Sequence, residues 1–367
     1  MKRRWRMIYL MLPLVLLWLS GCSTLGYYMQ AINGHLDIVS HERPIDEILA
    51  DKNTAPELKK RLALALEARR FASKEMQLPD NDSYKEYAAL DRPYVVWTVV
   101  ATPAYSIKPK QWCFMVVGCL SYRGYFAKAD ADELAQDLKQ QGMDVALSGT
   151  IAYSTLGYFD DPLVSSMLKY DDATLIGTIF HELAHQRIHV DGDTSFNEAF
   201  AMAVEHEGLR RWYKKQGNEQ RYEKYLVQQQ RKYEFYRMLM RTRQALKTAF
   251  EQETTPQGKQ TAKQRIYAQL RAEYQTWSEA KAFHGFDKWM QRDLNNADLS
   301  LVATYQDLVP SFEGMLASVH GQIGEFYQLV QSLGAKDKKD RALLLAAYTN
   351  PGQAASLQTQ SQTQKPD

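Results

Sequence analysis

The sequence lacks a hydrophobic run long enough to cross a membrane as a helix. Its apolar run at residues 7–19 has about 13 residues, whereas a spanning helix needs about 20. A strong charge of one sign is also missing, because 45 basic residues stand against 43 acidic ones. Without an interleaved basic and aromatic patch either, we expect no nucleic-acid partner. No internal repeat is visible, and 45% hydrophobic with 24% charged residues is a globular composition.

The first 21 residues have the pattern of a signal peptide. Four basic residues within the first six positions precede the apolar run, and residues 1–21 contain no acidic residue. The segment ends in Leu19-Ser20-Gly21-Cys22, which resembles a bacterial lipobox. We therefore expect cleavage before Cys22 and lipidation of its thiol. An ordinary signal peptide followed by a chance cysteine is the alternative.

The residue after Cys22 indicates to which membrane the lipidated protein is sent. Ser23 resembles the pattern of lipoproteins sent to the outer membrane, so we expect a lipid anchor on the periplasmic face of a bacterial membrane, the outer more than the inner. Two or three acyl chains anchor a protein stably. The cleaved chain retains 41 basic and 43 acidic residues, a net charge of −2.

Only three cysteines are present, and lipidation of one leaves a single pair. An oxidising compartment permits a disulfide. Six positions separate Cys113 from Cys119, and Gly118 favours a turn between them. We expect these two cysteines to form a disulfide; two buried thiols on a strand are the alternative.

The segment His181-Glu182-Leu183-Ala184-His185 is the strongest chemical signal. Residues four apart lie on one face of a helix, so His181 and His185 can hold one metal ion while Glu182 reaches a metal-bound water. This is the zincin arrangement, and it predicts one Zn²⁺ per chain. Two core histidines with satisfied hydrogen bonds are the alternative, but they leave Glu182 unexplained. We expect Asp171 or Asp172 to cap this helix.

A catalytic zinc site needs a third protein ligand and an open position. The metzincin pattern would require glycine and histidine where Ile188 and Asp191 stand, although Asp191 remains a candidate carboxylate ligand. Glu198 is the better candidate, because antiparallel helices around the turn after Asp191 would place it within about one turn of His185. The alternative is a capping box in which Ser195 caps the second helix and Glu198 occupies its N3 position. Glu205, further along, is a candidate hydrogen-bond partner of a metal-bound imidazole.

Five segments are distinctive: Trp112-Cys113 through Cys119, Tyr122 to Phe126, Ala152 to Pro162, His181 to Gln186, and Phe196-Asn197-Glu198-Ala199-Phe200-Ala201. Together they resemble a family of predicted bacterial lipoprotein zinc aminopeptidases, gluzincin-like, with HExxH and NExxA motifs. The resemblance covers nearly the whole mature chain, from Cys22 to about Thr349. It implies a zinc peptidase and an aminopeptidase acting on a peptide or protein substrate.

The expected fold is α+β and predominantly α-helical, with a zincin-like core in which a small sheet precedes the metal-binding helix and the Glu-ligand helix. One peptidase domain covers 22–350, and a disordered tail follows at 351–367. We expect further helices at about 299–308, 311–333 and 339–349. Within the domain we expect a helical part at 24–90, the sheet at 93–160, active-site helices at 171–215, and a long helical hairpin with C-terminal helices at 218–349.

Glu182 is the expected general base, which takes a proton from the attacking water and passes it to the leaving amine. Tyr153 and Tyr158 are candidate donors to the oxyanion, although each can also be purely structural. Asp160 and Asp161 are candidates to hold the free ammonium of an aminopeptidase substrate. As turn residues before Pro162, they need no such role.

Two other functions remain open. One is a zinc endopeptidase, which needs no ammonium-binding carboxylate. The other is an outer-membrane assembly or scaffold lipoprotein with a structural or vestigial metal site. In that case the helical hairpin at 218–283 would be the arm that contacts a protein partner, whereas its charge is otherwise that of a solvated face.

Overall fold

A computed structural model of the chain describes residues 26–114, 118–152, 154–155, 157–302 and 308–348. The expected signal peptide, Cys22, Tyr153 and the tail at 351–367 lie outside the described residues. None of the helices that the structure describes combines the length and apolar character that a membrane crossing requires.

The fold is α+β and predominantly helical, as the sequence predicts. After a helix at residues 26–40 the elements are β1 (Glu42–Pro44), α2 (Ile45–Ala50), α3 (Pro56–Met76), β2 (Glu86–Ala88), β3 (Val96–Pro103), β4 (Trp112–Phe114), β5 (Gly118–Leu120), β6 (Arg123–Tyr125), α4 (Lys128–Gln140), β7 (Met143–Thr150), β8 (Leu163–Val164), a 3₁₀ turn η1 (Met167–Lys169), α5 (Asp172–Arg187), α6 (Thr194–Lys215), α7 (Glu219–Gln252), α8 (Pro256–Lys281), α9 (Asp287–Met290), α10 (Asn296–Val302), α11 (Val309–Ser318), α12 (Ile323–Gly334) and α13 (Lys338–Tyr348).

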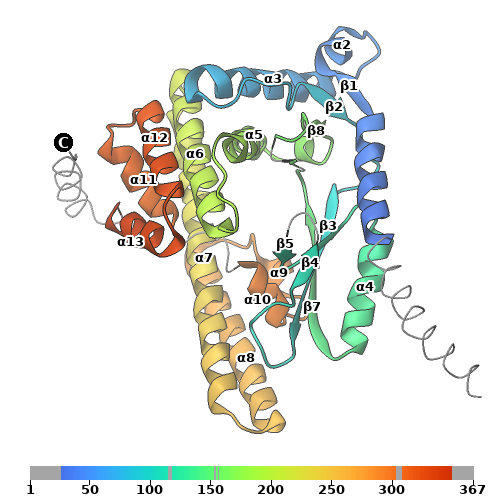
Figure 1. The fold of residues 1–367 in the computed structure, drawn as a ribbon, viewed down its shortest axis with the longest axis vertical. Helices are drawn as coiled ribbons and strands as arrows, with labels where there is room; N and C mark the ends of the chain where they lie inside the picture. The colour runs from blue at the N-terminus through green and yellow to red at the C-terminus, as the bar shows by residue number, and fades with distance from the viewer. Residues whose placement is uncertain (1–25, 115–117, 153, 156, 303–307, 349–367) are drawn as a thin grey trace, which may run out of the picture.

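The largest hydrophobic core joins α3, α5 and α6 to α11, α12 and α13. Figure 1 shows α3 across the top, α6 and α7 down one side, and α5 inside this frame. Glycines allow α5 and α6 to pack closely. A Cβ at Gly208 of α6 would lie 2.4 Å from Cδ2 of Phe180 on α5, closer than real Cβ contacts. This close packing positions the candidate site, because both helices contribute to it.

The main sheet is antiparallel, in the order β6-β3-β7. One face packs on α4, where Val99 and Val145 meet Leu138. On the other face, Val100 and Ala146 contact Ala297 of α10. A second sheet, β1-β2-β8, pairs β2 with β1 antiparallel and with β8 in parallel.

The structure corrects two predictions of helical segments. The segment 24–90 also contains β1 and β2, because β2 pairs with β8, whose partner residues Leu163 and Val164 lie far along the chain. The single helix expected at 311–333 is two helices, α11 and α12. Between them His320 and Gly321 have φ of 53° and 75°, a left-handed conformation that an α-helix does not contain.

The helical hairpin is confirmed as α7 and α8, which pack on each other around their own core. That core includes Phe235 and Leu239 of α7 and Leu270 of α8, and it extends to Ile107 and Leu299. The connection is short because Pro256 begins α8 and the Thr255 hydroxyl accepts a hydrogen bond from the Gly258 N–H at 3.0 Å. The hairpin is thus attached to the body of the protein.

Candidate metal centre

Helix α5 holds both histidines of the HExxH motif on one face. Its first turn is capped by Asp171, whose carboxylate accepts a hydrogen bond from the Thr174 N–H at 2.8 Å. The imidazoles of His181 and His185 have ring centroids 4.8 Å apart, and their Nε2 atoms are separated by 3.2 Å. Both rings therefore direct the same nitrogen toward one point.

Helix α6 begins two residues earlier than the sequence suggests, because its N-cap is Asp193 and not Ser195. The carboxylate of Asp193 accepts from the Phe196 N–H at 3.4 Å. Arg341 holds the same carboxylate with two donors, at 2.8 and 3.0 Å, and both side chains are buried. The N-cap predicted at Ser195 is therefore wrong, and the capping box with Glu198, the alternative to a metal ligand, does not form, because a buried ion pair fixes Asp193 at the cap.

The carboxylate of Glu198 lies at the histidines instead. One of its oxygens is 3.4 Å from Nε2 of His181, and the other is 3.7 Å from Nε2 of His185. Ligand atoms of the three residues lie within 4.8 Å of one another. Asn197 helps to fix the preceding turn, because its side-chain amide bonds both the N–H and the carbonyl of Val190, at 2.8 and 2.9 Å.

This donor set fits a zinc ion. Tetrahedral zinc takes imidazole nitrogen and carboxylate oxygen at about 2.0–2.2 Å, so its ligand atoms stand about 3–4 Å from each other. The separations between the two Nε2 atoms and the Glu198 oxygens are of this size. Asp191, the other candidate carboxylate, is fully exposed and approaches His189 at 3.8 Å, outside the cluster.

Glu205 of α6 lies behind His181. Its Oε2 is 3.3 Å from Nδ1 of His181, at ion-pair distance although outside hydrogen-bond geometry. Tyr225 of α7 donates its hydroxyl to Oε1 of Glu205 at 3.0 Å. Gly177 makes room for this carboxylate, because a Cβ there would lie 2.9 Å from Oε1 of Glu205. Such a partner orients an imidazole and fixes its tautomer.

Burial and neighbouring charges shift the pKa values of these groups in the metal-free chain. Burial raises the pKa of Glu182 to about 7, with contributions from Glu198 and other carboxylates, while His181 opposes them. Burial, followed by the charge of His181, lowers the pKa of His185 to about 3. For His181, burial also favours the neutral ring, but Glu198 and Glu205 outweigh it and raise the pKa well above its usual value.

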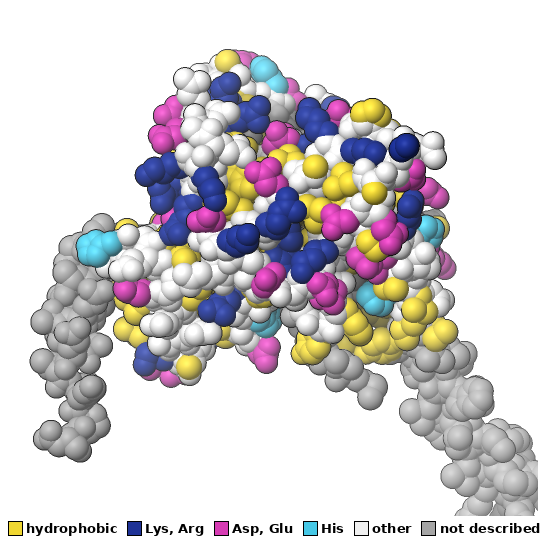
Figure 2. Space-filling model, turned by 90° about the horizontal axis from the view of Figure 1, so that it is seen from above, with side chains coloured by type: hydrophobic (Ala, Val, Ile, Leu, Met, Phe, Trp, Pro, Cys, Tyr) yellow, Lys and Arg dark blue, Asp and Glu magenta, His cyan; other side chains and the backbone are white. Residues whose placement is uncertain are grey.

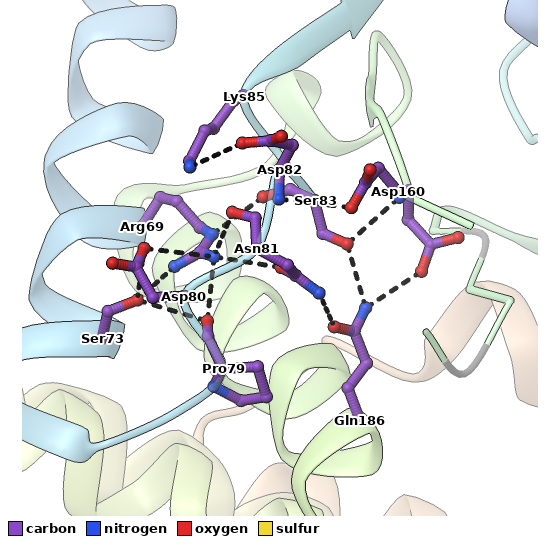
Figure 3. Close-up of polar contacts among 11 residues, drawn as sticks. Arg69, Ser73, Pro79, Asp80, Asn81, Asp82, Ser83, Lys85, Asp160 and Gln186 are labelled. Carbon is purple, nitrogen blue, oxygen red and sulfur yellow. Dashed lines mark hydrogen bonds and ion pairs between the residues drawn. The ribbon is translucent and has the colours of Figure 1, made fainter. Parts of the chain in front are cut away.

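The residue after His185 ties the site to a loop beside α3 (Figure 3). The side chain of Gln186 accepts from Asn81 at 2.8 Å and donates to Ser83 and Asp161, each at 3.2 Å. Arg69 of α3, only 1% exposed, organises this loop. It donates to the carbonyl oxygens of Ser83, Pro79 and Asn81 at 2.8–2.9 Å.

The two aspartates proposed from the sequence differ in their surroundings. Asp161 is buried, and its carboxylate accepts from the Thr155 N–H at 2.8 Å as well as from Gln186. The Asp161 carboxylate is therefore occupied by hydrogen bonds within the protein. Asp160 is exposed, and its carboxylate accepts a hydrogen bond from the Asp82 N–H at 3.2 Å. Asp160 is thus the one that a substrate can reach.

Two tyrosines that the sequence interpretation missed lie near the acidic groups of the site. Burial raises the pKa of Tyr122, and the Glu198 carboxylate raises it further. Burial also raises the pKa of Tyr84, followed by the charges of Glu182 and Asp161. By contrast, Tyr158 is 85% exposed. No local pattern distinguished Tyr122 and Tyr84, because only the tertiary fold brings them to α5 and α6.

The structure joins Cys113 and Cys119 in a disulfide. The two residues are paired across the β4–β5 hairpin, which leads directly to Tyr122. The cross-link therefore constrains the segment before this tyrosine.

Comparison with known proteins finds one family. Residues 26–345 match the family described as "Putative aminopeptidase". No curated protein matches the chain, and no solved structure does.

Proposed function

Since the chain belongs to the family described as "Putative aminopeptidase", we propose that it is a zinc-dependent aminopeptidase anchored by a lipid on Cys22 to the periplasmic face of a bacterial outer membrane. The observation that carries the proposal is the convergence of His181, His185 and Glu198, whose ligand atoms lie within 4.8 Å of one another. These three residues would hold one Zn²⁺. The ion would supply Lewis acidity toward water and the peptide carbonyl.

Glu182 supplies the proton transfers. Its raised pKa, about 7 in the metal-free chain, suits a group that accepts and returns a proton near neutral pH. It takes a proton from the attacking water and delivers it to the nitrogen of the leaving amine. Its place between the two histidines in sequence puts it on the same turns of α5.

Tyr122 is the proposed donor to the developing oxyanion. A tyrosine hydroxyl can stabilise this charge only if it stays protonated, and the partial burial of Tyr122, which is 43% exposed, together with Glu198 raises its pKa in that direction. Tyr158 is less suitable, because its side chain is almost wholly in solvent. Tyr153 lies outside the described residues and remains a sequence-based candidate.

Asp160 is the proposed partner of the substrate ammonium. It is exposed, and it lies near Glu42, whose pKa is raised first by burial, then by Glu86, and also by the charge of Asp160. An ammonium would be attracted to this negative region. An endopeptidase would not need such a region, so the amine group is the feature that separates the two activities.

The test uses the mature chain, residues 22–367, and its Glu182→Gln variant. We expect about one zinc per chain in both proteins, with peptide hydrolysis lowered by at least about 100-fold in the variant. Glu223→Gln, an exposed glutamate of α7, is the matched control and should retain activity. A chain that binds no zinc after dialysis against it would refute the proposal.

A second comparison separates the two peptidase activities. The same peptide is supplied with a free amino terminus and with an acetylated one. Cleavage of the free peptide alone is expected of an aminopeptidase, and Asp160→Asn should raise KM for it more than it lowers kcat. Equal cleavage of both peptides would make the enzyme an endopeptidase.

A further inference from the structure

The helix at residues 26–40 has an exposed apolar face. Met29, Ile32, Leu36 and Val39 are 48%, 52%, 56% and 43% exposed. Their spacing of three, four and three residues places them within about 80° of arc on a helix of 3.6 residues per turn. Asn33 and Ser40, which border this arc on one side, are exposed and uncharged.

The opposite face of this helix is attached to the body of the protein. Gln30 donates to the Gly124 carbonyl and accepts from the Phe126 N–H, both at 3.2 Å. Ile38 is fully buried. The apolar face is therefore held in a fixed position, and its exposure is not the result of an undocked helix.

The apolar surface continues onto the loop beside the metal centre. Phe159 is 62% exposed, and its ring lies 5.3 Å from that of His35 on the helix. Figure 2 shows hydrophobic side chains gathered toward one edge, while basic and acidic side chains are mixed over the rest of the face seen. We name Met29, Ile32, Leu36, Val39 and Phe159 the apolar face.

The length of chain before the helix identifies the occupant. Gly26 follows Cys22 by four positions, so even a fully extended chain between them spans at most about 14 Å. A lipid on Cys22 would therefore keep the helix within reach of the bilayer surface. A helix that lies in the membrane–water interface, with its apolar face inserted into the bilayer, strengthens the membrane binding that a lipid anchor provides.

We propose that the apolar face inserts into the phospholipid bilayer beside the lipid anchor, so that the protein lies on the membrane in one orientation. The inference rests on the anchor in the proposed function, not on the peptidase activity. In this orientation the loop that carries Phe159 and Asp160 borders the membrane. Substrates would then reach the metal centre along the membrane surface.

The test uses the full chain, processed in its bacterial host and reconstituted in vesicles of phosphatidylethanolamine and phosphatidylglycerol that contain a doxyl-labelled lipid. An environment-sensitive fluorophore is attached at Ile32→Cys. The matched control is Leu343→Cys, an apolar residue that is 65% exposed and belongs to α13, a helix on the opposite side of the molecule from residues 26–40. We expect quenching at position 32 to exceed that at position 343 by at least about twofold.

Flotation of the same vesicles separates the possible failures. Protein that floats but shows equal quenching at both positions would overturn the inference while leaving the anchor intact. Wild-type protein that does not float would overturn both the inference and the lipid anchor. Zinc content and peptide hydrolysis, measured in the same sample, test the proposed peptidase activity separately.

Crosslinking of two Ile32→Cys chains to each other, without quenching, would identify a second copy as the occupant of the apolar face and exclude the bilayer. An Ile32→Asp, Leu36→Asp double variant should lose the orientation but keep hydrolysis of a soluble peptide.

Discussion

The carboxylate of Glu205 lies 3.3 Å from Nδ1 of His181, on the side of the ring away from the metal-ligand cluster. Such partners fix the tautomer and orientation of a ligand, and their loss lowers metal affinity by about 10–100-fold. Glu205→Ala should therefore weaken zinc binding to that extent, measured by competition with a chelator. Gly177→Ala should act in the same direction, because the new Cβ would displace the Glu205 carboxylate. Unchanged zinc affinity in both variants would contradict this role.

Glu198 and Asp193 separate metal binding from helix capping. Glu198→Gln should lose zinc but keep its metal-free melting temperature, since Glu198 does not cap α6. Asp193→Ala removes the cap and leaves Arg341 buried without its partner, which costs about 3–5 kcal/mol. Zinc analysis and chemical denaturation of both variants measure the two effects. A large fall in metal-free stability in Glu198→Gln would revive the capping interpretation.

Tyr122→Phe should lower kcat/KM by about 100-fold, the usual effect of removing one oxyanion donor. KM should change little, because the hydroxyl acts on the transition state. Tyr158→Phe is the matched control and should have nearly wild-type activity, since its ring is in solvent. Steady-state kinetics on one peptide compare the two variants. Equal activities would exclude Tyr122 as the donor.

Arg69→Met should destabilise the protein by about 3 kcal/mol, because the carbonyls of Ser83, Pro79 and Asn81 lose their buried donor. The loop that is hydrogen-bonded to Gln186 would also become less ordered. We therefore expect the activity per folded molecule to fall as well. Arg70→Met, the exposed neighbour on α3, controls for the lost charge and should change stability little. Urea denaturation gives the free energies.

Glu42 predicts a pH dependence of stability. Burial raises its pKa to about 7 in the folded state, and the neighbouring Glu86 adds to the shift. The folded chain therefore binds the Glu42 proton more tightly than the unfolded chain. This difference stabilises the folded state fully below about pH 4.5, and the stabilisation is lost as pH rises through about 7. Glu42→Gln should flatten the profile of melting temperature in this range. Glu47→Gln, an exposed glutamate of α2, should leave the slope unchanged.

Elements formed by local patterns could be predicted from the sequence. Helices α4, α7, α8 and α13 follow from periodicity, breakers and caps. The break at His320 and Gly321 was missed because a left-handed residue such as His320 has no strong sequence signal. The β1-β2-β8 sheet was missed for a different reason: its strands have three residues or fewer, and their pairing depends on segments far apart in the chain.

The sequence alone determined that His181 and His185 share a face of α5 with Glu182 beside them, because helical geometry depends on neighbouring residues only. It left the role of Glu198 open between two local interpretations. The tertiary structure decided that α6 is capped by Asp193, since Arg341, 148 residues away, holds that carboxylate. It also brought Glu198, Glu205 and Tyr122 toward the histidines, because the packing of α5 on α6 and the path of the β4–β5 hairpin depend on contacts between distant segments.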